Sequence, residues 1–189
     1  MKNVVLNGKL IRLRPLRLSD ASDLITGLNN PDVLCWLSSV SYPVSLKQEK
    51  EFVRKTIKEW KGGESLTLGV EHKLLKRIIG CCDLHMNKKD NRAFYGLWIA
   101  KEFWGIGLGK EMARLVFDFG FRKVGLNRIE YSLFAPNVRS KALIEGLGGK
   151  FEGIRRQFRK KKDDRYYDDL VYSILRKEWL GKRSNAKHL

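Results

Sequence analysis

Cysteine is scarce in this sequence. There are three, Cys35, Cys81 and Cys82, and two of them are adjacent. An odd number of cysteines is a poor basis for a disulfide framework, and without a C-x-x-C pair a zinc site is not expected. We therefore expect reduced, buried thiols and no bound metal.

Long apolar runs are also missing. No segment approaches the roughly 18 consecutive apolar residues that a membrane-spanning helix needs. The N-terminal stretch MKNVVLNGKLIRLRP carries charge but lacks the apolar core of a signal peptide. We expect a protein that does not enter a membrane and that works in the cytoplasm.

Acidic residues are outnumbered. Lys and Arg total 38 against 21 Asp and Glu, and the net charge is +17. Such a charge attracts anionic ligands and partners and disfavours the capture of a free polycation. An acidic partner or the ribosome surface is therefore expected. No RNP, KH or zinc-knuckle pattern accompanies the charge, so simple RNA binding is disfavoured.

The remaining composition is that of a folded globular protein. The chain has 189 residues, 43% hydrophobic and 31% charged, which predicts one domain with a real core. We see no internal repeat, linker or low-complexity segment. The domain is expected to span residues 1–180, and residues 181–189 form a polar tail.

Apolar spacing and turn residues predict a mixed α/β order. The runs SLTLGVEH, KRIIGCCDLHM and NRAFYGLWIA are separated by short polar turns, which predicts an antiparallel meander. The other expected elements are a strand at 8–16, helices at 19–30, 45–63, 107–124 and 137–149, a strand at 128–135 and a hairpin of 151–160 with 165–176.

A glycine-rich loop, EFWGIGLGKEM, joins a predicted strand to a predicted helix. Glycines before a helix let the backbone approach an anion, and the first helical amides are unpaired donors. The P-loop pattern fails because Glu111 follows Gly109–Lys110 where Ser or Thr is needed. The dinucleotide fingerprint is weak because Lys110 occupies the position of its third glycine.

The loop resembles the acetyl-CoA loop of the GNAT N-acetyltransferase superfamily, written [QR]-x-x-G-x-[GA]. Trp104 stands at the first position, and Gly107 and Gly109 stand at the glycine positions. Tryptophan at this position departs from the general pattern. The resulting WGxG motif resembles the RimJ/RimL-like subgroup, the ribosomal-protein-alanine N-acetyltransferase type, in which WGxG is common. The segments LIRLRPLRLSDASDL, IIGCCDLH, APNVRSKALIEGLGGKFEG and RYYDDLVYSILRKEW resemble that subgroup in order, so residues 8–180 are covered.

This resemblance implies a single-domain GNAT-like fold of the α/β (α+β) class, with a central mixed, mostly antiparallel twisted sheet flanked by helices. It implies that backbone amides from Trp104 through Lys110 hold the pyrophosphate of acetyl-CoA, and that the preceding strand end pairs with its pantetheine arm. The residues expected to bind the co-substrate are Trp98, Ile99, Ala100, Trp104, Gly105, Ile106, Gly107, Leu108, Gly109, Lys110, Asn137, Ser140 and Lys141.

Acetyl transfer to an amine sets modest chemical demands. An α-ammonium with a pKa of about 8 must lose a proton, and the leaving thiol, with a pKa of about 8.5, needs little help. In RimL-like enzymes the serine of N-x-x-S lies close to the cofactor sulfur; here it is Ser140, three residues after Asn137. The resemblance therefore implies that Ser140 is catalytic and donates a hydrogen bond to the leaving thiolate. Asn137 is also a natural helix cap. The tyrosine that other GNAT members use is replaced by Ile144.

The resemblance supplies no general base in this sequence. Relatives carry a glutamate near the positions of Phe94 or Arg159, and neither residue is a carboxylate here. The remaining candidates are Asp83, His85, Glu130 and Asp168, or water alone. We select His85 as the catalytic base because its ordinary pKa suits proton removal near neutral pH.

Three acceptor hypotheses stay open. The first is the N-terminus of a ribosomal or other protein, attacked directly in a ternary complex. The second is a small amine such as spermidine, whose site needs carboxylates; Glu49, Glu51 and Glu59 are available but alternate with lysines. The third is a non-catalytic protein that binds coenzyme A or associates with RNA. Either a monomer or a homodimer is compatible with the sequence.

Overall fold

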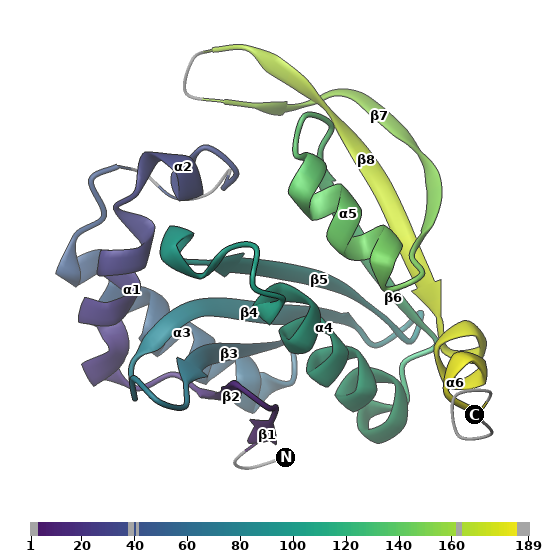
Figure 1. The fold of residues 1–189 in the computed structure, drawn as a ribbon, viewed down its shortest axis with the longest axis horizontal. Coiled ribbons are helices and arrows are strands. Elements are labelled where there is room, and N and C mark those ends of the chain that lie inside the picture. The colour runs from purple at the N-terminus through teal and green to yellow at the C-terminus, as the bar shows by residue number, and fades with distance from the viewer. Residues whose placement is uncertain (1–3, 38–39, 41, 162–163, 185–189) are drawn as a thin grey trace. The chain divides into compact units, whose positions relative to one another are not determined.

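The computed structural model describes residues 4–37, 40, 42–161 and 164–184 (Figure 1). Helices and strands alternate irregularly along the chain. In order they are β1 (Leu6–Asn7), β2 (Ile11–Pro15), the 3-10 turn η1 (Leu18–Asp20), α1 (Ala21–Leu28), α2 (Pro31–Leu34), α3 (Leu46–Gly62), β3 (Ser65–His72), β4 (Ile78–Asn87), β5 (Arg92–Ile99), the 3-10 turn η2 (Lys101–Phe103), α4 (Leu108–Phe119), a π-helical turn (Gly120–Val124), β6 (Arg128–Phe134), α5 (Val138–Gly146), β7 (Lys150–Lys160), β8 (Tyr166–Leu175) and α6 (Arg176–Ser184).

The eight strands form one open mixed sheet in the order β1-β2-β3-β4-β5-β6-β8-β7. The pair β5–β6 is parallel, whereas β1–β2, β2–β3, β3–β4, β6–β8 and β7–β8 are antiparallel. The predicted α/β sheet is thereby confirmed. The elements β1, α2 and α6 were not expected from the sequence. Helix α6 continues to Ser184, so the first part of the expected tail is helical.

The chain divides into two compact units. The first comprises Met1–Met86 and Gly96–Leu115, and the second comprises Asn87–Tyr95 and Val116–Leu189. Strand β5 and helix α4 each contribute one end to the first unit and the other end to the second.

In the first unit, α3 lies against the sheet. Ser45 and Gln48 form a capping box at its start, and Gly63 ends the helix with a left-handed backbone at φ 68°. Val53 of α3 packs with Leu24 and Cys81 in a buried cluster, against which Trp98 also packs.

An arginine is buried in the same unit. Arg14 of β2 is only 8% exposed, and its guanidinium donates to Asp20 Oδ1 and Oδ2 at 2.9 and 2.8 Å and to Glu71 Oε2 at 2.5 Å. Arg12 donates to the other oxygen of Glu71 at 2.5 Å. These carboxylates raise the pKa of Arg14 further. Each charge in the group has a partner, as buried charges require.

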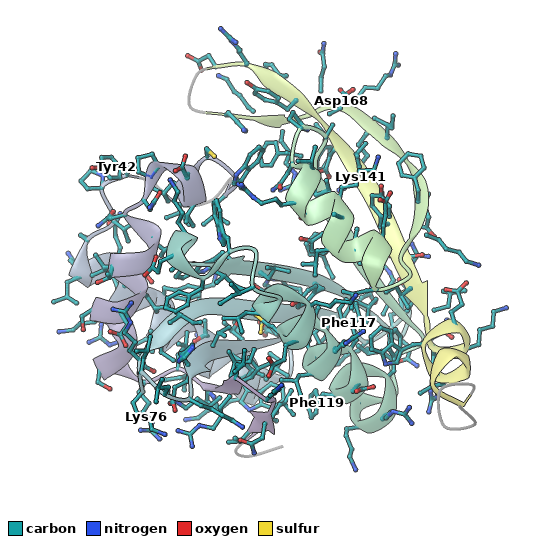
Figure 2. The ribbon with its side chains drawn as sticks, in the orientation of Figure 1. Tyr42, Lys76, Phe117, Phe119, Lys141 and Asp168 are labelled. Atoms are coloured by element: carbon teal, nitrogen blue, oxygen red, sulfur yellow. The ribbon has the colours of Figure 1, made fainter. Side chains whose placement is uncertain are left out.

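Aromatic side chains fill the core of the second unit. Phe117 of α4, labelled in Figure 2, is fully buried and contacts Tyr95 at 4.9 Å and Trp179 at 5.4 Å between ring centroids. Trp179 of α6 also packs against Phe121 and donates from its indole nitrogen to Asp118 Oδ1 at 2.8 Å. Helix α6 is thus fixed by an apolar contact and a hydrogen bond together.

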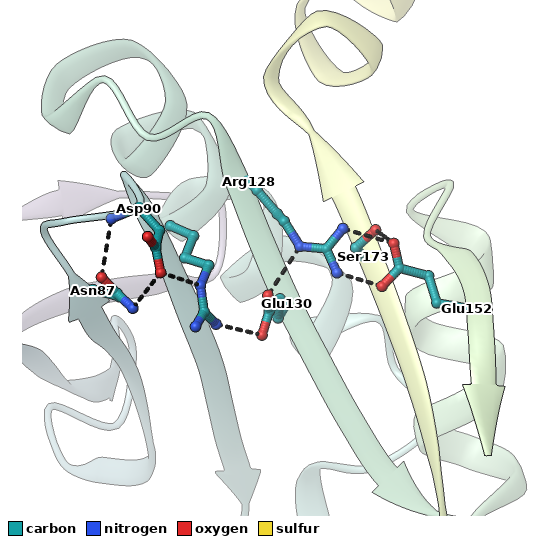
Figure 3. A network of polar contacts seen from close by, with 7 residues as sticks. Asn87, Asp90, Arg128, Glu130, Glu152 and Ser173 are labelled. Atoms are coloured by element: carbon teal, nitrogen blue, oxygen red, sulfur yellow. Dashed lines mark hydrogen bonds and ion pairs between the residues drawn. The ribbon is translucent and has the colours of Figure 1, made fainter. Parts of the chain in front are cut away.

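A chain of ion pairs crosses the strands of the second unit (Figure 3). Glu130 of β6 accepts from Arg92 at 3.0 Å and from Arg128 at 2.9 Å. Arg128 also forms a two-pronged pair with Glu152, which accepts from Ser173 at 2.7 Å. The carboxylate of Glu130 is therefore shared between two guanidinium groups.

Candidate active site

The glycine loop begins with a short turn whose backbone amides donate hydrogen bonds to carbonyl groups in the same segment. In η2, Phe103 N donates to Ala100 O at 3.0 Å and Trp104 N donates to Lys101 O at 3.1 Å. At the start of α4, Lys110 N donates to Gly107 O at 3.1 Å. The amides of Trp104 and Lys110, both expected to face a ligand, are thus engaged within the loop.

Five amides lie between those two. The N–H groups of residues 105–109 make no hydrogen bond to any part of the chain that the structure describes. Gly105 and Gly107 have φ of 80° and 88°, a conformation that favours glycine, and a Cβ at either position would meet open space. Successive unpaired amides in a turn that opens a helix form an anion site.

The helix that follows the loop is held firmly to the sheet. Leu108, its first residue, is 1% exposed, and Glu111 in its first turn accepts the amides of Leu10 and Ile11 at 3.0 and 3.4 Å. The acidic side chain in this turn therefore points to strand β2 and its surroundings. A positive helix end fixed in this way keeps its charge available for an anion.

The end of β5 is held close to β4. A Cβ on Gly80 would lie 2.4 Å from Trp98 O, so only glycine permits this approach. Ala100 N donates to Ile79 O at 2.8 Å, and the indole of Trp104 donates to Ile99 O at 2.7 Å. The Ala100 amide is therefore not free to bind the expected pantetheine arm. The Ile99 carbonyl already accepts one hydrogen bond and could accept only one more from that arm.

The N-x-x-S stretch, Asn137 to Ser140, lies in the second unit. Asn137 caps α5 by accepting Ser140 N at 3.1 Å, so its predicted capping role is confirmed. Ser140 Oγ lies 2.5 Å from the hydroxyl of Tyr131 on β6. Lys141 projects from α5 (Figure 2), with its Nζ 4.0 Å from Glu145.

His85 lies on β4 beside an acidic side chain. Its Nε2 is 3.2 Å from Asp83 Oδ1, and its side chain is 58% exposed. The Asp83 carboxylate raises the pKa of His85. Asp83 itself lies over Gly96, where a Cβ would come within 2.7 Å of its Oδ1. His85 can thus exchange a proton with solvent and holds it more tightly than a free imidazole does.

A family model described as an acetyltransferase (GNAT) domain matches residues 11–150. The chain belongs to the GNAT family. It is 31% identical over 156 residues to "Putative ribosomal N-acetyltransferase YdaF" of Bacillus subtilis (strain 168), covering 78% of this chain and 80% of that protein. It is 27% identical to "Uncharacterized N-acetyltransferase p20" of Bacillus licheniformis, covering 90% of this chain and 96% of that protein.

Solved structures agree on the fold. Mycobacterium smegmatis RimJ, solved in complex with CoA-disulfide, has a TM-score of 0.80 at 21% identity and covers 92% of this chain and 86% of its own. The family model and the two curated relatives make the protein a GNAT N-acetyltransferase. The likeness to RimJ shows that the two proteins share the fold.

Two of the other base candidates in this GNAT acetyltransferase already have partners. Glu130 is shared between Arg92 and Arg128. Asp168 accepts the amide of Gln157 at 2.8 Å and so holds a bulge in β7. Sequence reasoning could not separate these carboxylates from a catalytic one, because their partners lie on other strands or across a hairpin.

The cysteines do not gather into a site. Cys81 and Cys82 are buried, and burial raises the pKa of both thiols well above the ordinary value. The expectation of a buried thiol is wrong for Cys35, which follows the short helix α2 and is exposed. In the parts of the chain that are described, no three His, Cys, Asp or Glu side chains come together as a metal site would, and no helix is long and apolar enough to cross a membrane.

Proposed function

We propose that this enzyme transfers an acetyl group from acetyl-CoA to the α-amino group of a protein N-terminus. The observation that carries the proposal is the run of five unpaired amides at residues 105–109, in front of a helix fixed to the sheet. A diphosphate fits such a site because its charge and its acceptor oxygens match the donors. The open space at Gly105 and Gly107 leaves room for it.

The co-substrate brings an activated acetyl thioester, and the chain supplies the contacts. In this proposal the amides of Gly105, Ile106, Gly107, Leu108 and Gly109 hold the diphosphate, and Trp104 shapes the loop through its bond to Ile99 O. Trp98, Ile99 and Ala100 line the pantetheine arm. The exposed Lys110 and Lys141 add positive charge, and Asn137 fixes the helix that carries Ser140.

Two side chains carry the chemistry in this proposal. Ser140 donates a hydrogen bond to the thiolate of coenzyme A as it leaves. His85 in its neutral form accepts the proton of the acceptor ammonium, directly or through water. Because the thiol is already acidic, the larger share of the rate comes from holding the amine and the thioester together.

The carboxylates favour a protein N-terminus over a polyamine. A polyamine site must offer several unpaired carboxylates to several ammonium groups. Here Glu130, Glu152, Asp169 and Glu71 each pair with one or two arginines. An N-terminus presents a single amine, and its peptide chain can be held by backbone hydrogen bonds.

A thiol-release assay distinguishes the acceptors. The substrates are peptides with a free N-terminus and spermidine, and the matched control is the same peptides with an acetylated N-terminus. We expect turnover with the free peptides and none with the blocked ones. Turnover with spermidine but not with the free peptides would show that the acceptor is a polyamine and not a protein N-terminus. Binding of coenzyme A measured by calorimetry, with no turnover on any amine, would reject the catalytic role.

The basic surface suits an acidic partner such as the ribosome. On β7, Arg156 and Phe158 are exposed, and the Arg155 guanidinium lies 3.9 Å from the Phe158 ring centroid. Electrostatic docking weakens with salt. We expect KM for a ribosome-bound acceptor to rise steeply between about 50 and 200 mM salt, while KM for the isolated N-terminal peptide stays nearly constant. An equal salt dependence would argue against docking.

A further inference from the structure

Two hydroxyl groups in the second unit bind each other. The Tyr131 hydroxyl and Ser140 Oγ are 2.5 Å apart, and neither makes another hydrogen bond to the described residues. The pair joins strand β6 to helix α5. Between them the two groups have two protons but share one hydrogen bond, so one proton points elsewhere.

Burial decides which group donates. The Tyr131 side chain is buried at 6% exposure, whereas Ser140 is half-buried. If Ser140 donated, the phenolic proton would be buried without an acceptor, at a cost of about 1–3 kcal/mol. If Tyr131 donates, the spare proton belongs to Ser140 and can reach outside the pair. The phenol is also the more acidic hydroxyl, and therefore the better donor.

The surroundings keep the phenol in place and protonated. The Tyr131 ring packs against Tyr95 at 5.9 Å between centroids and stands opposite Tyr172 in the β6–β8 register. Burial raises the pKa of Tyr131, although the Ser140 hydroxyl opposes that shift. Tyr131 therefore remains a donor throughout the pH range in which an acetyltransferase works.

We propose that Tyr131 is a positioning residue that turns the Ser140 hydroxyl proton toward the leaving thiolate. This inference rests on the proposed acetyl transfer. In that reaction the N–C bond forms and the C–S bond breaks, the amine proton passes to the base or to water, and the electron pair of the C–S bond stays on sulfur. Tyr131 transfers no proton; it fixes the direction of the one that Ser140 offers.

The first test does not need turnover. Affinities for coenzyme A and for its analogue without sulfur, desulfo-coenzyme A, are measured by calorimetry near pH 9, where the thiolate of a thiol with a pKa of about 8.5 predominates. We expect wild type to prefer coenzyme A by about tenfold, the value of one charge-assisted hydrogen bond. Tyr131→Phe and Ser140→Ala should each remove most of this preference, and the double variant should lose no more than Ser140→Ala does.

Tyr172→Phe is the matched control. Tyr172 is a buried tyrosine opposite Tyr131, and its hydroxyl donates to Glu145 at 3.0 Å instead of Ser140. Loss of the Tyr172 hydroxyl should lower the stability about as much as loss of the Tyr131 hydroxyl does. It should leave the preference for coenzyme A over desulfo-coenzyme A unchanged. In turnover, Tyr131→Phe should lower kcat by about tenfold with KM for acetyl-CoA unchanged.

The outcomes separate this inference from the proposed function. If Ser140→Ala removes the preference and Tyr131→Phe does not, the role of Tyr131 is overturned while acetyl transfer stands. The role of Tyr131 is also overturned if the wild-type enzyme binds coenzyme A and desulfo-coenzyme A equally well, because no hydroxyl group then donates a hydrogen bond to the sulfur. Acetyl transfer itself is judged by thiol release from the wild-type enzyme.

Discussion

Asp83 Oδ1 lies 3.2 Å from Nε2 of His85, two residues further along strand β4. The carboxylate stabilises the imidazolium and raises the pKa of His85. A base must be neutral to accept a proton, so kcat/KM should rise with pH as His85 loses its proton at that raised pKa. Asp83→Asn removes the stabilising charge, and the rising limb of the pH profile should shift to lower pH.

His85→Gln provides the complementary measurement. If His85 is the base, this variant should lose roughly 10²-fold in kcat/KM and lose the rising limb. A variant with wild-type rate and an unchanged limb would assign the base to water or to another group. Calorimetry with coenzyme A serves as the control. Asp83 and His85 lie on β4, outside the glycine loop, so the affinity for coenzyme A should stay unchanged in both variants.

The glycine loop gives a second prediction. Gly107→Ala adds a methyl group where the diphosphate would lie and also strains a backbone at φ 88°. Gly125→Ala is its matched control, with φ 83° and open space around its Cβ but at the end of the π-helical turn. Each should cost about 1–2 kcal/mol of stability. Calorimetry should show coenzyme A binding at least tenfold weaker for Gly107→Ala and unchanged for Gly125→Ala; equal affinities would contradict the loop assignment.

Glycine spacing predicted the loop and its place before a helix because the left-handed backbone at Gly105 and Gly107 is a local feature that a short motif can encode. The same reasoning found the cap at Asn137, since caps are local. It could not find the bond between Tyr131 and Ser140, because a strand residue and a helix residue meet only through the fold. The buried Arg14 was equally hidden: its partner Glu71 is 57 residues away.

Glu49 illustrates a carboxyl group that the fold removes from solvent. It lies on α3 at 6% exposure, and its Oε2 has no hydrogen bond to the described residues. Burial raises the pKa of Glu49. The folded protein therefore binds this proton more tightly than the unfolded chain does, and the resulting stability is full below the unfolded pKa and lost as pH rises through the folded pKa.

Glu49→Gln should therefore stabilise the protein at high pH only. We expect Tm to rise by about 2–4 °C at pH 8, which corresponds to about 1 kcal/mol for a chain of this size, and to stay unchanged near pH 4. Glu51→Gln, an exposed position on the same helix, is the control and should change Tm at neither pH. A loss of Tm at pH 8 for Glu49→Gln would mean that the carboxylate has a partner.

Asp168 and Asp169 are adjacent, yet the structure gives them different tasks. Asp169 is 0% exposed and pairs with both Arg155 and Arg159, and Arg159 also donates to Ser132 Oγ at 2.7 Å. Among the described residues, the side chain of Asp168 accepts the backbone amide of Gln157 and forms no ion pair. The ion pairs of Asp169 thus join β7 to β8 across a shift in register.

Asp169→Asn leaves two guanidinium groups without their shared charge. Removing one partner of a buried ion pair costs about 3–5 kcal/mol, and the partial exposure of Arg155 lowers the expected loss here to about 2–3 kcal/mol. Asp168→Asn keeps an oxygen acceptor for Gln157 N and should stay within about 0.5 kcal/mol of wild type. Urea denaturation of the two variants measures both values. Similar losses would show that β7 is held by its backbone pairing rather than by Asp169.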